Sequence, residues 1–338
     1  MTIKDLALKT GYSVGTISRV LNNQPNVSQR ARDAILEAVE ESGFQLNSNA
    51  KQLKQHRSTS VLVEVKGTSN ELFGSLVEAI QSRLVRTEYP VIVDYLDEDD
   101  DEVLRAGQLC REKKPRGILF LGGNRVNFER SFQQIHVPCV LVTSGAQGLH
   151  FSNLSSVTSD DRLGAYMAID HLVDLGHRNI AVIGGDRSVS DTSRLRYEGC
   201  LDAFSRHNLA FDPDRDYRGG RFSFEEGYRA ARSLLEEGRP YTAIFAAADV
   251  MAIGAIRALR DSGLRVPEDV SVMGYDGLRL GEYYVPKLAT VAQNVEMLAH
   301  RSVDILRSCM ENNGVARHEI VPITVICKES AQPVSGEE

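Results

Sequence analysis

The chain has 338 residues, of which 42% are hydrophobic and 25% are charged, and its formal net charge is −7. This composition is typical of a globular protein with room for two or three domains, and it excludes a largely disordered chain. Because no apolar run is long enough to span a membrane and the N-terminus has no apolar signal core, we expect a cytoplasmic protein. Five scattered cysteines without metal-ligand spacing indicate buried thiols in a reducing compartment.

Three short helices are predicted in the first 45 residues. Thr2 followed by Asp5 is an N-terminal capping signature, and Gly11 ends the helix that they begin. Ser13 and Ser28 are in position to cap a second and a third helix. The third helix has an inward stripe of four apolar residues, Ala31, Ile35, Ala38 and Val39. Together the three helices form a minimal core.

The second of these helices has the composition of a DNA recognition helix. Val14, Ile17 and Leu21 lie on an inward stripe. The outward set is small, polar and basic: Gly15, Thr16, Arg19 and Asn22. Threonine contacts phosphates or bases, arginine forks onto guanine, and glycine permits close approach of the backbone. The alternative from the pattern alone is a helical subdomain without a ligand.

Charge is distributed unequally along the chain. Residues 1–57 contain eight Lys or Arg and five Asp or Glu, a net charge of +3, which leaves −10 for the rest. Only the N-terminal segment is therefore suited to nucleic acid, and a single copy would bind DNA weakly and in a salt-sensitive way.

The stretch 46–57, LNSNAKQLKQHR, links this segment to the remainder. It is polar and basic, and Ala50 and Leu53 are its helix-spaced apolar residues. One interpretation is a solvated linker, because so short a segment is not a stable helix in water. The other is a helix that folds against a partner copy on DNA, with Leu53 as a wedge between base steps.

From residue 60 onward, short apolar runs alternate with helical segments. The predicted strands begin at residues 61, 90, 117, 138, 179, 242 and 270. The predicted helices span 70–88, 160–175, 192–207, 223–237, 249–262 and 295–312. Apolar runs that end in glycine or polar residues before a helix predict parallel sheets covered on both faces, that is, a doubly wound α/β body. Its length and the new series that begins at residue 160 favour two similar lobes.

Ligands of such sheets lie beyond the carboxyl ends of the strands, so the cleft between two lobes is the expected pocket. Three side chains suit a small polar ligand, and two of them, Arg196 and Asp276, come from the segments that follow predicted strands. Arg196 can clamp hydroxyls or a carboxylate, Asp276 can accept two hydroxyl hydrogen bonds, and Phe222 can stack on a ring face. The alternatives are a surface ion pair for Arg196, a turn cap for Asp276 and a core position for Phe222.

Two other features favour structural interpretations. The run 97–102, DEDDDE, suits a loop that leads into a helix N-terminus better than a metal site, since consecutive acids cannot all face one ion. Asp249 is interpreted as the N-cap of the helix that follows it. The residues after the strands supply no convincing nucleophile with a base, metal set or phosphate loop, so no catalytic residue or cofactor is predicted.

Several phrases of the sequence resemble the lactose-repressor/galactose-repressor family of bacterial transcription regulators. They are the N-terminal helices, the linker, LGHRNIAVIGG at 175–185, RLRYEGC at 194–200, AAADVMAIGAIRAL at 246–259 and GLRVPEDVSVMGYD at 263–276. The resemblance covers residues 2 to 330. It implies a sequence-specific DNA-binding regulator, expected to be a repressor, whose operator affinity a small molecule switches.

The resemblance also implies domain limits. A helix-turn-helix head would span 1–45, a hinge helix 46–57, and a two-lobed body of the type I periplasmic-binding-protein-like fold 58–338. Lobe one would comprise about 58–158 plus 295–322, and lobe two about 159–294 plus 323–330. The body would form a homodimer that reads near-palindromic operator DNA. No tetramerising heptads are found at the C-terminal end of the sequence.

Family positions for DNA contact map onto twelve residues of this chain. They are Thr2, Ser13, Val14, Gly15, Thr16, Ser18, Arg19, Asn22 and Asn26 in the head, and Asn47, Ala50 and Leu53 in the hinge. Leu53 would be the minor-groove wedge. Val14 and Gly15 carry no side-chain hydrogen-bonding groups, unlike the residues of many family members at the reading positions. The resemblance therefore implies that Arg19 and Thr16 do most of the base reading.

Family positions for the effector map onto seven residues: Thr143, Ser159, Arg196, Phe222, Ala248, Asp276 and Gln293. Thr143 and Ser159 replace frequent acids and Ala248 replaces a frequent Asn, which predicts a pocket less acidic than a typical hexose site. A sugar or sugar derivative is the leading effector class. The alternatives are a purine, a nucleoside or a sugar phosphate that acts as a corepressor, and, more remotely, a solute-binding protein.

Overall fold

The structure is a computed structural model that describes residues 3–21, 27–42, 59–67, 70–312 and 314–334. It divides into two compact units, residues 1–58 and 59–338. The predictions for Thr2, Asn22, Asn26 and the whole linker 46–57 lie outside the described residues.

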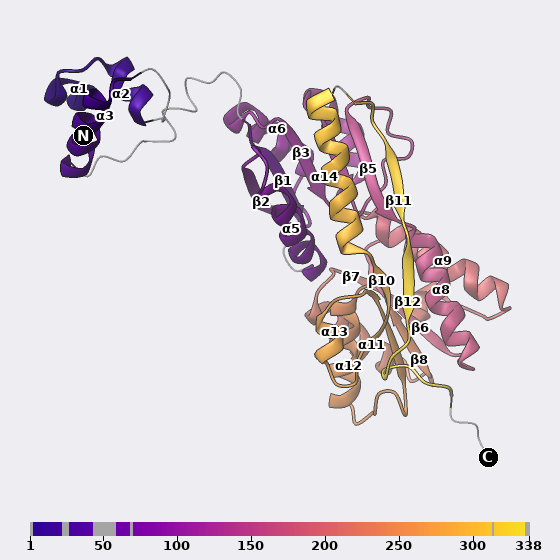
Figure 1. Ribbon diagram of the computed structural model, residues 1–338. Helices are drawn as coiled ribbons and strands as arrows, with labels where there is room; N and C mark the ends of the chain where they lie inside the picture. The colour runs from indigo at the N-terminus through magenta and orange to yellow at the C-terminus, as the bar shows by residue number, and fades with distance from the viewer. Residues whose placement is uncertain (1–2, 22–26, 43–58, 68–69, 313, 335–338) are drawn as a thin grey trace. The chain divides into compact units, whose positions relative to one another are not determined.

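The N-terminal unit consists of the three predicted helices. They are α1 (Ile3–Thr10), α2 (Val14–Leu21) and α3 (Gln29–Ser42) (Figure 1). Their buried side chains form one small core of Leu6, Ile17, Val20, Ile35 and Ala38. The predicted caps are confirmed, because the Thr16 N–H donates to Ser13 Oγ at 3.2 Å and the Ala31 N–H to Ser28 Oγ at 3.4 Å. Gly11, with φ at +70°, follows the end of α1 as expected.

The prediction that Val14 belongs to the inward stripe of α2 is wrong. Its side chain is 38% exposed, whereas Val20 is 3% exposed and packs with Ile17 in the core. A helical side chain covers the turn that precedes its own Cα. Val14 is the first helical residue, so no helical turn precedes it, and its side chain lies on the surface that the reading positions share.

Two six-stranded sheets organise the second unit (Figure 1). The sheet of lobe one has the order β11-β5-β4-β3-β1-β2, and all its neighbouring strands are parallel. Its strands are β1 (Val61–Lys66), β2 (Val91–Leu96), β3 (Gly117–Leu121), β4 (Cys139–Val142), β5 (Leu154–Ser159) and β11 (His318–Val321).

The sheet of lobe two has the order β12-β10-β9-β8-β6-β7, and only the β10–β12 pair is antiparallel. Its strands are β6 (Ile180–Gly185), β7 (Tyr217–Gly220), β8 (Ala243–Ala246), β9 (Ser271–Asp276), β10 (Ala289–Gln293) and β12 (Ile323–Ile326). The chain passes from one sheet to the other after β5, after β10 and between β11 and β12.

Helices cover both faces of each sheet, which confirms the doubly wound two-lobed body. Lobe one carries α5 (Glu71–Leu84), α6 (Glu102–Lys113), α7 (Arg125–Ser131), the 3-10 turn η1 (Phe132–Gln134) and α14 (Val295–Asn312). Lobe two carries α8 (Asp161–Asp174), α9 (Asp191–Arg206), α10 (Pro213–Asp216), α11 (Phe224–Glu236), α12 (Asp249–Asp261) and α13 (Leu280–Tyr283). Alternate β1 residues serve the two faces: Val61 and Val63 pack in the cluster that contains α5 and α14, and Leu62 packs with α6 and α7.

All five cysteines are free thiols. Cys139 and Cys200 are buried, and Cys110 and Cys309 are half-buried. The prediction of a buried thiol is wrong for Cys327, which is exposed and lies just after the last residue of β12, outside the sheet. None of the described helices is long and apolar enough to cross a membrane.

Candidate functional site: a cleft between two lobes and a helix-turn-helix surface

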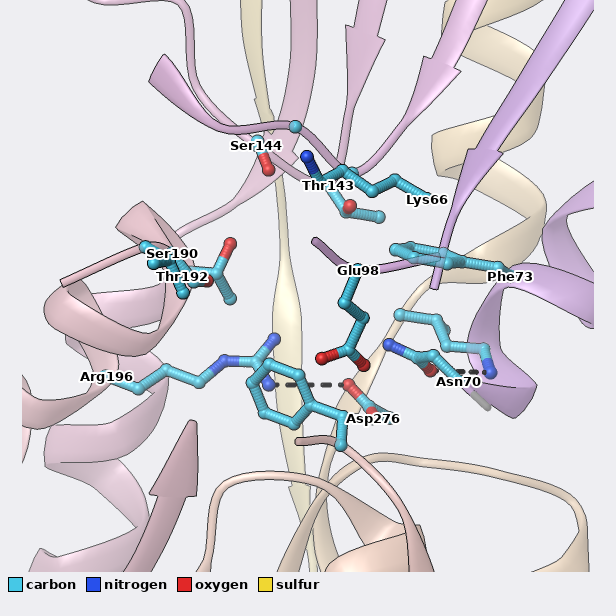
Figure 2. Close-up of a pocket in the computed structure, with 15 residues that line it drawn as sticks. Lys66, Asn70, Phe73, Glu98, Thr143, Ser144, Ser190, Thr192, Arg196 and Asp276 are labelled. Atoms are coloured by element: carbon cyan, nitrogen blue, oxygen red, sulfur yellow. Dashed lines mark hydrogen bonds and ion pairs between the residues drawn. The ribbon is translucent and has the colours of Figure 1, made fainter. Parts of the chain in front are cut away.

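A cavity of about 100 Å³ lies between the two lobes, at the carboxyl ends of strands from both sheets (Figure 2). Lobe one lines it with Lys66, Asn70, Phe73, Glu98, Thr143 and Ser144, among others. Lobe two lines it with Val189, Ser190, Thr192, Arg196, Phe222 and Asp276. Four of the seven predicted effector residues line this one cavity: Thr143, Arg196, Phe222 and Asp276.

Arg196 is the most tightly held side chain of the cavity. It is 5% exposed, its Nε donates to Asp161 Oδ1 at 2.8 Å, and its Nη1 donates to the Ala247 carbonyl at 2.5 Å. Its guanidinium lies over the ring of Tyr275, 3.7 Å from the centroid. The surface ion pair considered from the sequence is thus excluded, because the partner Asp161 is 4% exposed. Two fixed acceptors and a stacking face leave the remaining guanidinium N–H groups oriented for a ligand.

Asp276 ends β9 opposite Arg196. Its Oδ1 is 3.7 Å from Arg196 Nη1 and accepts a hydrogen bond from Gln293 Nε2 at 2.8 Å. Burial raises its pKa to about 6, against the opposing effects of Arg196 and Gln293. A carboxylate so held is ionised at neutral pH and can accept hydrogen bonds from ligand hydroxyls.

Ser159 and Gln293 do not line the cavity, although both were predicted to touch the effector. They lie one layer behind it: Ser159 Oγ donates to Gln293 Oε1 at 2.8 Å, and Gln293 in turn supports Asp276. Ser159 ends β5 and Gln293 ends β10, so this hydrogen bond joins two of the three segments that cross between the lobes. Position after a strand had selected Ser159, and the family resemblance had selected Gln293, but the packing buries both residues behind the cavity wall.

Ala248 and Asp249 also differ from expectation. Ala248 is fully buried, does not line the cavity and occupies the N-cap of α12, without a side-chain cap. The prediction that Asp249 is this N-cap is therefore wrong. Asp249 is the first helical residue, and its carboxylate accepts hydrogen bonds from Thr290 Oγ1 and the Leu278 N–H, each at 2.6 Å. It turns inward because Gly274 has no Cβ, which would lie 2.2 Å from Asp249 Oδ1.

The sequence analysis assigned no ligand role to Lys66, Phe73 or Glu98, all of which line the cavity. Glu98 comes two residues after β2, so the strand-end rule would have found it. It lies within the acidic run 97–102, which was interpreted as a loop that leads into a helix. That interpretation is confirmed for Asp101, whose carboxylate caps α6 by accepting from the N–H groups of Val103 and Leu104. It overlooked Glu98, and the cavity is more acidic than predicted.

On the N-terminal unit, the predicted reading residues of α2 share one accessible surface. Ser13, Val14, Gly15 and Arg19 are exposed, and Thr16 and Ser18 are half-buried. The hydroxyls of Ser13 and Thr16 lie 3.0 Å apart. Arg19 forms no hydrogen bond or ion pair with the part of the chain that the structure describes, so its guanidinium is available to a partner.

Comparison with known proteins assigns both parts of the chain. Residues 2–47 match the family described as "Bacterial regulatory proteins, lacI family", and residues 169–331 match the "Periplasmic binding protein-like domain". The HTH-type transcriptional regulator MalR of Clostridium butyricum is 34% identical over 338 residues, covering 98% of this chain and 99% of its own. The HTH-type transcriptional repressor PurR of Haemophilus influenzae is 29% identical over 341 residues, with the same coverage.

Solved structures of transcriptional regulators are similar to this chain over nearly its whole length. The lac repressor dimer bound to operator and the anti-inducer ONPF superposes with a TM-score of 0.82 at 27% identity, covering 98% of this chain and 99% of that one. The complex of the transcriptional regulator CelR with cellobiose has a TM-score of 0.71 at 26% identity, with the same coverage.

A helix-turn-helix unit on the same chain as a two-lobed, cleft-bearing body defines the class of ligand-responsive DNA-binding regulators. The chain belongs to the LacI family of bacterial regulatory proteins. Like these relatives, it is a transcriptional regulator and not an enzyme. The match of residues 2–47 to a DNA-binding family sets aside the alternative of a solute-binding protein.

Proposed function

We propose that this regulator binds a near-palindromic operator as a homodimer and that a sugar or sugar derivative in the inter-lobe cleft switches its operator affinity. The observation that carries the effector assignment is the buried cluster of Arg196 and Asp276, which presents a fixed donor and a fixed acceptor to one small cavity. A hydroxyl both donates and accepts, so polyhydroxylated molecules satisfy the two groups together. The complex of CelR with cellobiose supports this class.

The second candidate is a purine, a nucleoside or a sugar phosphate that acts as a corepressor. The similarity to PurR repressors favours keeping it, and Phe222 on the cavity wall is suited to stacking on a base or on a sugar face.

On DNA, α2 would enter the major groove. Arg19 and Thr16 would read base edges, while Val14 and Gly15 would allow methyl contact and close approach. Ser18 would lie in the major groove with these residues, and Ser13 would lie near phosphates or groove edges. The predicted contacts of Thr2, Asn22, Asn26, Asn47 and Ala50, and the minor-groove wedge Leu53, fall outside the described residues and complete the proposal.

Dimerisation through the body would bring two heads to the two half-sites of the operator. The superposition on the lac repressor dimer bound to operator supports this assembly. A regulator of operator DNA would work in the cytoplasm.

The coupling between cleft and DNA would run through the segments that cross between the lobes. A ligand that engages Asp276 is two hydrogen bonds from Ser159, by way of Gln293. Closure of the lobes around the ligand would therefore move the three segments that cross between the lobes. The surface of lobe one that leads into these segments would move with them. A coupling free energy of about 1–3 kcal/mol between the two sites is expected, and it acts equally in both directions.

The experiment combines a thermal-shift panel of sugars, sugar phosphates and nucleosides with operator gel shifts. An effector at one hundred times its dissociation constant raises the unfolding free energy by about 2.7 kcal/mol. Arg196→Ala should abolish that stabilisation, and the effector should change operator affinity only in the parent protein. If Arg196→Ala binds the effector as tightly as the parent does, the cleft assignment is wrong.

A further inference from the structure

We infer that Glu98 selects the charge of the ligand: it makes the cleft accept uncharged polyhydroxylated molecules and reject their phosphorylated forms. This inference rests on the proposed function, because it takes the cleft to be the effector site, and it decides between the two candidate ligand classes. It comes from the part of the acidic run that the sequence analysis left without a role.

The position of Glu98 is fixed from both lobes. Its neighbours in the chain, Asp97 and Asp99, both pair with Arg221 of lobe two, Asp97 Oδ2 at 3.2 Å from Arg221 Nη1. The backbone N–H of Phe222 donates a hydrogen bond to the Glu98 carboxylate across the same gap. These contacts join the two lobes beside Glu98. Figure 2 shows the Glu98 carboxylate directed into the cavity, toward Arg196 and Asp276.

The backbone beside Glu98 is shaped to let it point inward. A Cβ on Gly67 would lie 3.1 Å from Glu98 Cγ, tighter than ordinary contact, so the glycine leaves the space that the side chain uses. Burial raises the pKa of Glu98, and the hydrogen bond from Phe222 opposes that effect. The side chain is half-buried, so hydroxyl donors of a ligand would replace part of the solvent that its carboxylate has lost.

The cations that line the cavity are already neutralised. Lys66 Nζ pairs with Glu102 and donates to the Asp100 carbonyl. Arg196 is flanked by two carboxylates, those of Asp161 and Asp276. A phosphate in the cavity would thus meet one arginine whose charge two acids balance, together with the carboxylate of Glu98.

The consequence is electrostatic discrimination. Like charges about 5 Å apart in a partly desolvated site repel strongly enough to weaken binding by about tenfold to a hundredfold. An uncharged sugar avoids this cost, since its hydroxyls donate to Glu98 and Asp276 and accept from Arg196. The cavity therefore favours the neutral member of any sugar and sugar-phosphate pair.

The test uses matched probes with the full-length protein: glucose and glucose 6-phosphate, ribose and ribose 5-phosphate, and inorganic phosphate alone. Calorimetric titration compares the parent with Glu98→Gln and Glu98→Lys. Glu112→Gln and Glu112→Lys are controls with the same changes of charge at an exposed lobe-one position outside the cavity. The parent should prefer the neutral sugar by at least about tenfold. Glu98→Gln should lose most of that preference, and Glu98→Lys should bind the phosphorylated probe or inorganic phosphate, whereas the Glu112 variants should match the parent.

The outcomes separate this inference from the proposed function. If the parent binds a phosphorylated probe as tightly as its neutral partner, or if the Glu98 variants discriminate as the parent does, the role of Glu98 is refuted while the sugar cleft stands. If no member of either pair binds any variant, and phosphate does not bind Glu98→Lys, both the sugar assignment of the cleft and the inference fail.

Discussion

Glu64 offers a quantitative test of how this fold handles a buried charge. The residue lies in the middle of β1 and is 1% exposed, and neither carboxylate oxygen has a hydrogen-bond partner within the described part of the chain. The nearby cations are engaged elsewhere, Arg105 with Asp94 through two hydrogen bonds of 2.9 Å and Lys66 with Glu102. Burial, reinforced by the charges of Asp94 and Glu102, raises the pKa of Glu64 from 4.5 to about 9.

The sign of the pH dependence follows from proton linkage. Between pH 4.5 and 9 the folded protein keeps a proton on Glu64 that the unfolded chain has lost, so the unfolding free energy falls as pH rises through this window. The slope from this one group is about 1.4 kcal/mol per pH unit. At pH 7 the accumulated cost is about 3 kcal/mol, and below pH 4.5 it disappears.

Glu64→Gln keeps the shape of the protonated acid and removes the titration. We expect the variant to gain stability relative to the parent by about 1.4 kcal/mol per pH unit from pH 5 to pH 8, reaching about 3 kcal/mol at pH 7. Urea unfolding of the full chain at several pH values measures the difference, with the exposed Glu112→Gln as a control. A difference between Glu64→Gln and the parent that stays constant across this range would refute the reasoning.

Three further predictions concern the cleft, the DNA surface and the helix packing. The pKa of Asp276 is about 6, and its ionised form accepts hydrogen bonds from ligand hydroxyls. Effector affinity measured by calorimetry should therefore be constant above pH 7 and fall as pH drops below 6. An affinity that stays constant down to pH 5 would contradict the role of Asp276. Arg19→Ala should weaken binding to an operator selected from random duplexes by about 1–3 kcal/mol in gel shifts and change binding to unrelated DNA far less, whereas equal losses on both would leave Arg19 only a phosphate contact. Gly199→Ala should lower the unfolding free energy of the body by about 1–3 kcal/mol in urea unfolding, because the new Cβ would lie 2.0 Å from the Arg162 carbonyl oxygen. Gly74→Ala is the control and should not destabilise the protein, because nothing lies within 4 Å of its Cβ. Similar stability of the two variants would show that α8 and α9 can separate freely.

The sequence was informative wherever structure depends on near neighbours. The caps Ser13 and Ser28, and the alternation of apolar runs with helices, each involve residues within a few positions of one another. The caps are confirmed, and the alternation predicted seven of the twelve strands but not β5, β7, β10, β11 or β12. Position after a strand likewise placed Arg196 and Asp276 in one cleft, because the carboxyl ends of parallel strands meet at one edge of a sheet.

What the tertiary structure decided is which neighbours distant residues have. Asp249 turns into the core because Gly274, 25 positions later, leaves room for its carboxylate. Ser159 and Gln293 lie behind the cavity because they bond to each other across the crossing between lobes.

Glu98 shows the same limit most clearly. The strand-end rule selects Glu98 by its place after β2, but within DEDDDE an acidic side chain at every position hides which one enters the cavity. Arg221 and Phe222, more than 120 positions away, hold the loop so that Asp97 and Asp99 face the opposite lobe and Glu98 lines the cavity. The sequence by itself therefore determined the two-part architecture and the place of the cleft, and only the packing of one lobe against the other decided which charges a ligand meets there.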